Sequence, residues 1–200
     1  MIIRPAEPAD RDAIARICLL TGDVARDATG VFCDDAAISD VYATPYLYGP
    51  GGFAVVWDVD GEPRGYVLGT DDTVAFQEWF TREWWPRVGA HRTQVTAKDE
   101  WLLAAAADPE RMLEPHVAQY PAHLHIDLLP EAQGKGAGRA LIEAAVALLA
   151  KRGVGGVHLG ADAANAGALA FYPRVGFEIL SRDAGGVLFG RRIAADFPAG

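Results

Sequence analysis

The sequence contains few cysteines, few lysines and no long apolar run. Its 200 residues include two cysteines, Cys18 and Cys33, which excludes a small scaffold held together by several disulfides. The longest apolar runs, 102–107 and 144–150, are far shorter than the ~18 residues that cross a bilayer, so we expect no membrane span. Charged residues crowd the first dozen positions, which is wrong for a signal peptide. We therefore expect a cytoplasmic protein with free thiols.

Basic side chains are also scarce. Lysine and arginine number 18 against 27 aspartates and glutamates, which gives a formal net charge of −9. Because the phosphates of DNA and RNA bind to clustered basic residues, we expect no nucleic-acid partner. The acidity favours a cationic ligand, although an acidic balance more commonly serves only solubility. The lysines are especially rare, and one of them, Lys135, lies among glycines.

A chain of this length predicts one domain, 1–200, with room for an insertion. Folding at this size buries roughly 70% of the unfolded surface, so the core needs no metal or disulfide. The first seventy residues predict an N-terminal strand, a helix after Pro8, a short helix over 34–42 and a hairpin. The hairpin is the strongest of these signals, because two β-rich runs flank Asp60-Gly61, a pair typical of two-residue turns.

The pattern changes over 71–120, which we interpret as a helical insertion of two or three helices broken near Pro86 and Pro109. Four of the five tryptophans lie in it: Trp79, Trp84, Trp85 and Trp101. Aromatic residues at helical spacing usually belong to a core. The alternative is a lid over a substrate or a subunit contact, because tryptophan is enriched in pockets and interfaces.

The last third alternates strands and helices around a glycine-rich turn. We expect strands over 122–129 and 156–160, helices over 139–152 and 165–172, and a terminal hairpin of 177–181 with 187–192. An early hairpin followed by strands joined through helices predicts an α+β fold, with a mixed β-sheet flanked by helices.

The glycine-rich turn, Gln133-Gly134-Lys135-Gly136-Ala137-Gly138-Arg139, joins a strand to the N-terminus of a helix. Alternate glycines let the backbone approach a ligand and point successive N–H groups at it. Together with the helix dipole, these donors predict an anion site, most naturally for a phosphate, with Lys135 and Arg139 at its rim. The glycine spacing matches neither the dinucleotide motif nor the nucleotide P-loop. A tight turn without a ligand is the alternative interpretation.

Two motifs in this part of the chain resemble a known family. The GCN5-related N-acetyltransferases (GNAT) carry Gln/Arg-x-x-Gly-x-Gly/Ala at a strand-to-helix turn, which 133–138 matches position by position. They also place an asparagine, a small residue and a tyrosine on a later helix, as Asn165, Ala168 and Tyr172 stand here. More narrowly, 123–130 resembles the acetyltransferase-like C-terminal domain of O-GlcNAcase and its bacterial relatives.

The resemblance implies a strongly twisted sheet and acetyl-CoA as co-substrate, with its pyrophosphate on the amides of the glycine turn. The pantetheine arm would lie between two diverging parallel strands, 124–129 and 157–160, where Asn165 would bind it. Tyr172 would donate a proton to the leaving thiolate; a core tyrosine is the alternative. The cofactor-binding residues implied in this way are Leu128, Leu129, Gln133, Gly134, Lys135, Gly136, Ala137, Gly138, Arg139, Asn165, Ala168 and Tyr172.

Acetyl transfer to an amine also needs a base. Side chains alternate between the faces of a strand, so His123, His125 and Asp127 share one face. We expect Asp127 to be the base and rank His125 second, although either could be a hydrogen-bonded polar residue at a strand end. The same face could hold zinc or iron. We predict no metal site, since such a site would need a further ligand from His91, His116, His158 or Asp162.

These observations predict an acyl-CoA-dependent N-acetyltransferase. A primary amine would attack the acetyl thioester directly, and backbone amides of the strand over 124–129 would hold the oxyanion. A non-catalytic acetyl-CoA-binding module is the alternative from another class, and a metal-dependent hydrolase is a weaker one. We expect the amine to bind near 34–48 and 71–120, the parts least constrained by the cofactor, and leave a homodimer open.

Overall fold

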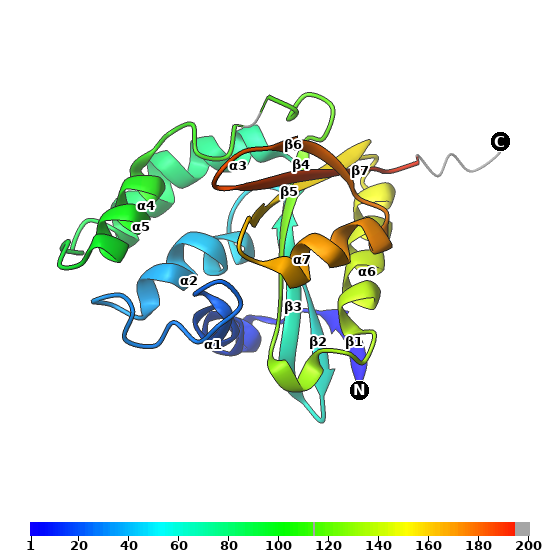
Figure 1. Cartoon of the computed structure of the whole chain (residues 1–200), viewed down its shortest axis with the longest axis horizontal. Helices are drawn as coiled ribbons and strands as arrows, with labels where there is room; N and C mark the ends of the chain where they lie inside the picture. Colours follow the sequence, from blue (N-terminus) through cyan, green and yellow to red (C-terminus); the bar gives the residue numbers. More distant parts are fainter. Residues whose placement is uncertain (114, 195–200) are drawn as a thin grey trace.

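The computed structural model describes residues 1–113 and 115–194, so Glu114 of the predicted insertion and 195–200 of the predicted domain lie outside it (Figure 1). One mixed sheet has the strand order β1-β2-β3-β4-β5-β7-β6. Its strands are β1 (Ile2–Pro5), β2 (Gly52–Val59), β3 (Glu62–Thr70), β4 (Ala122–Leu128), β5 (Gly156–Asp162), β6 (Glu178–Arg182) and β7 (Gly186–Arg192). The α-helices are α1 (Arg11–Thr21), α2 (Ala36–Tyr42), α3 (Thr73–Trp79), α4 (Trp85–Val88), α5 (Ala97–Ala107), α6 (Ala137–Lys151) and α7 (Ala166–Phe171). The α+β prediction is confirmed.

The hairpin of β2 and β3 forms at the turn that the sequence indicates. Asp60 and Gly61 have φ angles of 56° and 88°, the positive values that a two-residue turn between twisted antiparallel strands requires. The side chains of β3 then alternate between the faces of the sheet. Tyr66 and Leu68 enter one apolar cluster, while Val67 enters the other.

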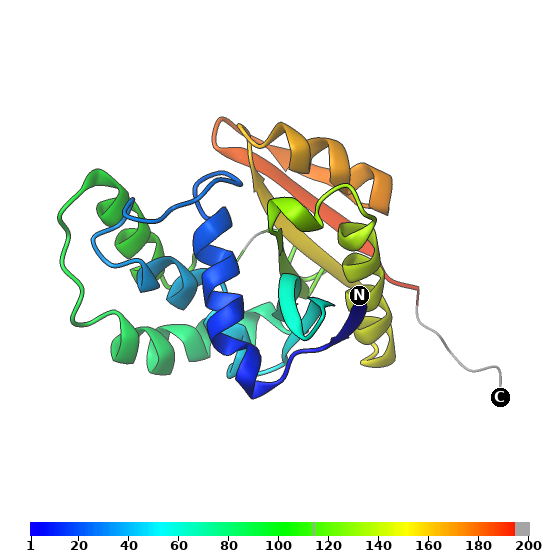
Figure 2. The same ribbon diagram turned by 90° about the horizontal axis from the view of Figure 1, so that it is seen from below.

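The two apolar clusters lie on opposite faces of the sheet. One contains side chains of α1, α2 and the helices after β3, and the other contains side chains of α6 and of the C-terminal strands. Figure 2 shows this division, with α1 and the helical segment on one side and α6 and α7 on the other. None of the helices in the described residues has the length and apolar character needed to span a membrane.

Strands β4 and β5 separate almost as soon as they pair. They are parallel neighbours, and their register consists of Ala122 with Val157 and His123 with His158. Beyond these pairs β4 stays bonded to β3 as far as Leu128, whereas β5 turns towards β7. The sheet is therefore split at its middle, and peptide groups of β4 beyond His123 lose their neighbour on one side.

The segment over 71–120 is helical, and its helical runs end at Val88 and Ala107, near Pro86 and Pro109 as predicted, although Pro86 itself lies within the first run. A π-helical turn (Phe80–Trp84) follows α3, and Pro86 stands in the first turn of α4. Proline has no N–H to donate. It is tolerated there because the hydrogen-bond register changes after the π-helical turn, so no helical carbonyl depends on an N–H at this position. Trp79, Trp84 and Trp85 pack against the core cluster, as the core interpretation predicts, whereas Trp101 of α5 is 55% exposed.

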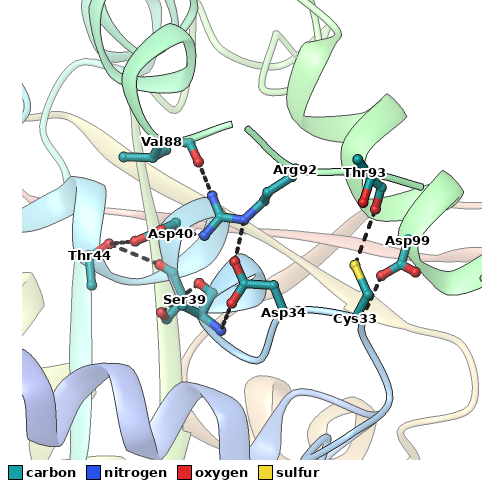
Figure 3. A network of polar contacts seen from close by, with 10 residues as sticks. Cys33, Asp34, Ser39, Asp40, Thr44, Val88, Arg92, Thr93 and Asp99 are labelled. Carbon is teal, nitrogen blue, oxygen red and sulfur yellow. Dashed lines mark hydrogen bonds and ion pairs between the residues drawn. The ribbon is translucent and has the colours of Figure 1, made fainter. Parts of the chain in front are cut away.

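A buried ion-pair network holds the connection between α4 and α5 against α2 (Figure 3). The Arg92 side chain is 3% exposed and lies 3.0 Å from Asp34 and 2.8 Å from Asp40. Next to it, Asp99 accepts from the N–H of Cys33 at 3.0 Å and caps the start of α5. Because buried charges without partners are costly, this network fixes how the helical segment meets α2. Both cysteines are free thiols, as expected.

Candidate functional site

The glycine turn presents a row of unsatisfied backbone donors. Gly134 and Gly136 have φ angles of 72° and 81°, and a Cβ on either would meet no atom within 4 Å. In the described part of the chain, the N–H groups of residues 134–139 have no hydrogen-bond acceptor. They lie at the N-terminus of α6, where the helix dipole adds positive potential. The turn is therefore an open, preformed seat for an anion.

A cavity of about 530 Å³ extends from this turn along the end of β4, with residues of α7 on its other side. We call it the first cavity. It is lined by Thr21, Ala25, Ile126, Asp127, Leu128, Gln133, Gly134, Gly136, Ala137, Gly138, Arg139, Asn165, Gly167, Ala168, Phe171 and Tyr172. Most of the residues that the motifs indicate thus meet around one space, although they come from β4, the glycine turn and α7.

Some predicted cofactor residues lie elsewhere. Leu129 is buried in the apolar cluster that contains α1, and the exposed Lys135 does not line the cavity. Arg139 lines it, but its guanidinium donates to the carbonyl of Arg174 at 2.8 Å. Of these three residues, only Arg139 lines the first cavity. Most of the hydrogen-bond donors there are backbone N–H groups of the glycine turn.

The third glycine of the turn has a packing role. A Cβ on Gly138 would lie 3.1 Å from the Phe171 ring and 3.4 Å from Leu128, so a larger residue would have to push the Phe171 ring aside by a few tenths of an ångström. Asn165 begins α7, because its side-chain oxygen accepts from the N–H of Ala168 at 3.0 Å. Its amide nitrogen has no partner among the described residues and borders the cavity as a free donor.

The split in the sheet also exposes backbone donors of β4. The N–H of Leu129 donates to Arg64 on the β3 side at 3.0 Å. Because peptide groups alternate sides along a strand, the N–H groups of Ile126 and Leu128 point to the opposite side, into the gap left by β5. Both residues line the first cavity, which gives it polar groups along an otherwise apolar wall.

Tyr172 lines the first cavity. It is buried among Phe171, Phe177 and Phe189. Burial, with a smaller contribution from the negative charge of Asp127, raises the pKa of its phenol above the ordinary value. Tyr172 therefore keeps its proton and can serve as a proton donor.

Asp127 faces the same cavity from β4. Its carboxylate accepts from the hydroxyl of Tyr66 at 2.6 Å. Burial raises the pKa of Asp127, and the hydrogen bond from Tyr66 opposes that rise. A carboxylate with a raised pKa is a stronger base than an exposed one, which suits proton abstraction.

The histidines of β4 form a separate cluster beside Asp127. The Tyr46 hydroxyl lies 2.7 Å from Nε2 of His123 and 2.9 Å from Nε2 of His125, and Thr73 lies 2.9 Å from Nδ1 of His123. Both rings are neutral, because burial lowers the pKa of His123 and lowers that of His125 to about 3. Within 1–113 and 115–194, no group of three or more His, Cys, Asp or Glu side chains is arranged to hold a metal.

A second cavity of about 820 Å³ lies next to the first. The segment after α1 contributes to both, since Thr21 and Ala25 line the first cavity and 22–24 line the second. Val24 and Ala25 have φ angles of 54° and 61°, strained values that cluster at functional sites. The other residues of the second cavity are Phe32, Lys98, Trp101, Gly160, Ala161, Asp162, Ser181, Asp183, Gly185, Gly186, Val187 and Leu188.

Comparison with known proteins identifies the family. A model of the Acetyltransferase (GNAT) family matches residues 25–177. The crystal structure of SsHAT is 40% identical, covers 96% of this chain and 98% of its own, and aligns with a TM-score of 0.89.

More distant structures share the fold. The ribosomal-protein-S18-alanine N-acetyltransferase from Escherichia coli is 17% identical over 99% of this chain and 97% of its own, with a TM-score of 0.56. The PaiA N-acetyltransferase from Thermoplasma acidophilum, solved with coenzyme A, is 13% identical over 96% and 99%, with a TM-score of 0.57. The chain belongs to the GNAT family of acetyltransferases, which use acetyl-CoA as co-substrate.

Proposed function

We propose that this protein transfers the acetyl group of acetyl-CoA to a primary amine by direct attack. The observation that carries the proposal is the continuous first cavity, which joins the unpaired amides of 134–139 to the edge of β4 that β5 leaves unpaired. The pyrophosphate would bind those amides and the pantetheine arm would lie in the gap. Release of free coenzyme A thiol, measured across a panel of amines, tests the proposal. Amine-dependent release supports it, and binding of acetyl-CoA without any transfer contradicts it.

The residues around the cavity divide the chemistry among them. The N–H groups of Ile126 and Leu128 would hold the thioester oxygen as it gains negative charge. Asp127 would take the proton of the attacking amine, and Tyr172 would protonate the departing thiolate. His125 is the second candidate for the base, but a pKa of about 3 makes it a weak proton acceptor.

Replacing Tyr172 by phenylalanine is expected to lower turnover about tenfold to a hundredfold, because the thiolate then leaves without its proton donor. The affinity for acetyl-CoA should change little, since the ring remains packed among aromatic side chains. Steady-state rates and calorimetric titration with acetyl-CoA measure the two effects. Turnover equal to that of the unmodified protein would show that Tyr172 is structural.

We further propose that the amine enters from the second cavity, whose walls include Lys98 and Trp101 of the 71–120 segment but no residue of 34–48. The cavity carries three aspartates, of which Asp23 pairs with Lys98 at 3.0 Å. Among the described residues, Asp162 and Asp183 have no ion-pair partner within 4.0 Å. The cavity therefore suits an acceptor with a positive charge.

The double substitution Asp162→Asn and Asp183→Asn is expected to raise KM for a diamine acceptor about tenfold and to leave KM for a neutral-tailed monoamine nearly unchanged. Asparagine keeps the side-chain oxygens that accept from Ala164, Gly185 and Gly186, so both turns are preserved. Asp60→Asn, in the β2–β3 turn, is the matched control. An equal effect on both acceptors would contradict a role for the charge.

We also propose that the helical segment over 71–120 belongs to one domain with the rest of the chain. Phe76, Phe80 and Leu102 lie in the same buried cluster as Tyr66 and Leu68 of β3. The segment would then act as one wall of the acceptor site.

The narrower resemblance to the O-GlcNAcase C-terminal domain stays a prediction.

A further inference from the structure

A chain of hydrogen bonds links the histidines of β4 to the start of α3. Its members are Thr73, His123, Tyr46 and His125. Tyr46 comes from the short 3-10 turn Thr44–Leu47, so three separate elements meet here. His123 and Tyr46 are 6% and 1% exposed. Their polar atoms are therefore shielded from water and must form hydrogen bonds with one another.

The position of one proton sets all the others. The hydroxyl of Thr73 donates to the carbonyl of Pro121 at 2.7 Å, so its oxygen accepts from Nδ1–H of His123. Nε2 of the neutral His123 is then bare and accepts from the Tyr46 hydroxyl. Since that hydroxyl has a single proton, its oxygen accepts from Nε2–H of His125. Neutral His125 consequently has a bare Nδ1.

His125 lines neither cavity itself, but it is connected to both through its neighbours. Its neighbours along β4, Ile126 and Asp127, line the first cavity. On the other side the Tyr42 ring packs edge-on against His125 at 5.8 Å and stacks on Trp101 at 6.4 Å, and Trp101 lines the second cavity. His125 is also more exposed than His123. Among the described residues, no donor reaches its Nδ1.

We propose that Tyr46 is a positioning residue that fixes His125 in its Nε2–H form, so that Nδ1 accepts a hydrogen bond from the amino group of the acceptor. This inference rests on the proposed function. It adds His125 as a residue that selects acceptor substrates able to donate an N–H. His125 would orient the amine towards the thioester, and Asp127 would take its proton. The chemical class selected is a primary amine, which has N–H bonds left to donate as it attacks.

The surroundings keep this histidine uncharged. Arg111 lies over the rings of Tyr42 and Phe80 at 5.3 and 4.9 Å, and its positive charge adds to burial in lowering the pKa of His125. A protonated His125 would present an N–H at Nδ1 and repel an ammonium group. The neutral ring presents a lone pair instead.

Ring ¹⁵N spectra of the protein without substrate test the tautomers directly, because protonated and bare imidazole nitrogens have well-separated shifts. We expect His123 to carry its proton on Nδ1 and His125 to carry it on Nε2. His125→Gln provides the assignment. A proton on Nδ1 of His125 would overturn the inference.

Tyr46→Phe supplies the kinetic test. The ring keeps its stacking on Phe76 at 4.5 Å, while His125 loses the oxygen that fixes its tautomer. We expect a mixture of His125 tautomers and about a tenfold lower kcat, the effect of one lost hydrogen bond, with KM for acetyl-CoA unchanged. Thr29→Val, which removes an exposed hydroxyl bonded to Asp27 at 2.6 Å and outside the lining of both cavities, is the control.

The outcomes separate the two proposals. An unchanged His125 spectrum and unchanged kcat in Tyr46→Phe, with normal transfer in the unmodified protein, would contradict this inference alone. Absence of transfer to any amine by the unmodified protein would contradict the proposed function itself.

Discussion

Replacing Gly136 by aspartate is expected to abolish binding of acetyl-CoA. The Cβ at this position would point into open space at the mouth of the first cavity, where the pyrophosphate is proposed to bind. A carboxylate there would repel the phosphates and compete for the N–H groups of 134–139. The loss of two charge-assisted hydrogen bonds, about 1.5–3 kcal/mol each, corresponds to roughly 10²–10⁴ in Kd.

The backbone cost of this substitution can be separated from its effect on the ligand. Gly136 has a φ of 81°, and a side chain in that region costs about 1–2 kcal/mol. Gly61 of the β2–β3 turn has a φ of 88° and equally open space around its Cβ. Gly61→Asp should therefore lose similar stability and keep its affinity for acetyl-CoA.

Calorimetry with acetyl-CoA and thermal unfolding of both variants measure these effects. Gly136→Asp with an unchanged Kd would remove the glycine turn from the cofactor site. An equal loss of affinity in Gly61→Asp would assign the effect to stability and not to the turn.

The parts of the site that the sequence predicts are those encoded within one short segment. The glycine turn and the order of polar residues along β4 follow from local spacing, and the structure places the turn and Asp127 around one cavity. The turn at Asp60-Gly61 is predictable for the same reason, since two adjacent residues determine it.

The remaining parts depend on contacts between distant segments. Thr21 and Ala25 line the first cavity, yet they lie at and just after the end of α1 without any motif, and only packing of α1 against β4 brings them there. Tyr46 meets His125 across 79 positions of sequence. The break predicted near Pro86 comes after Val88, because the proline is accommodated in the first turn of α4 behind a π-helical turn.

Replacing Asp127 by asparagine is expected to lower turnover by roughly 10²–10⁴, the usual contribution of a general base. Asparagine has the same shape and still accepts from Tyr66, so the fold and the affinity for acetyl-CoA should be preserved. Single-turnover acetyl transfer and calorimetry measure the two quantities, with Asp60→Asn as the exposed control. If the variant keeps more than about a tenth of the rate, another group must be the base.

The dependence on pH identifies which group is the base. Asp127 acts as a base only when it is ionised. The rate should therefore be low at pH values below its raised pKa and should increase as the pH passes through that pKa. Removing the Tyr66 hydroxyl withdraws a hydrogen bond that lowers this pKa, so Tyr66→Phe should move the rising limb to higher pH. His125, with a pKa of about 3, would place that limb far lower and leave it unmoved in Tyr66→Phe. When both proteins are assayed with the same acceptor, titration of the acceptor amine affects both pH profiles equally. A shift of the rising limb in Tyr66→Phe therefore assigns the role of base to Asp127.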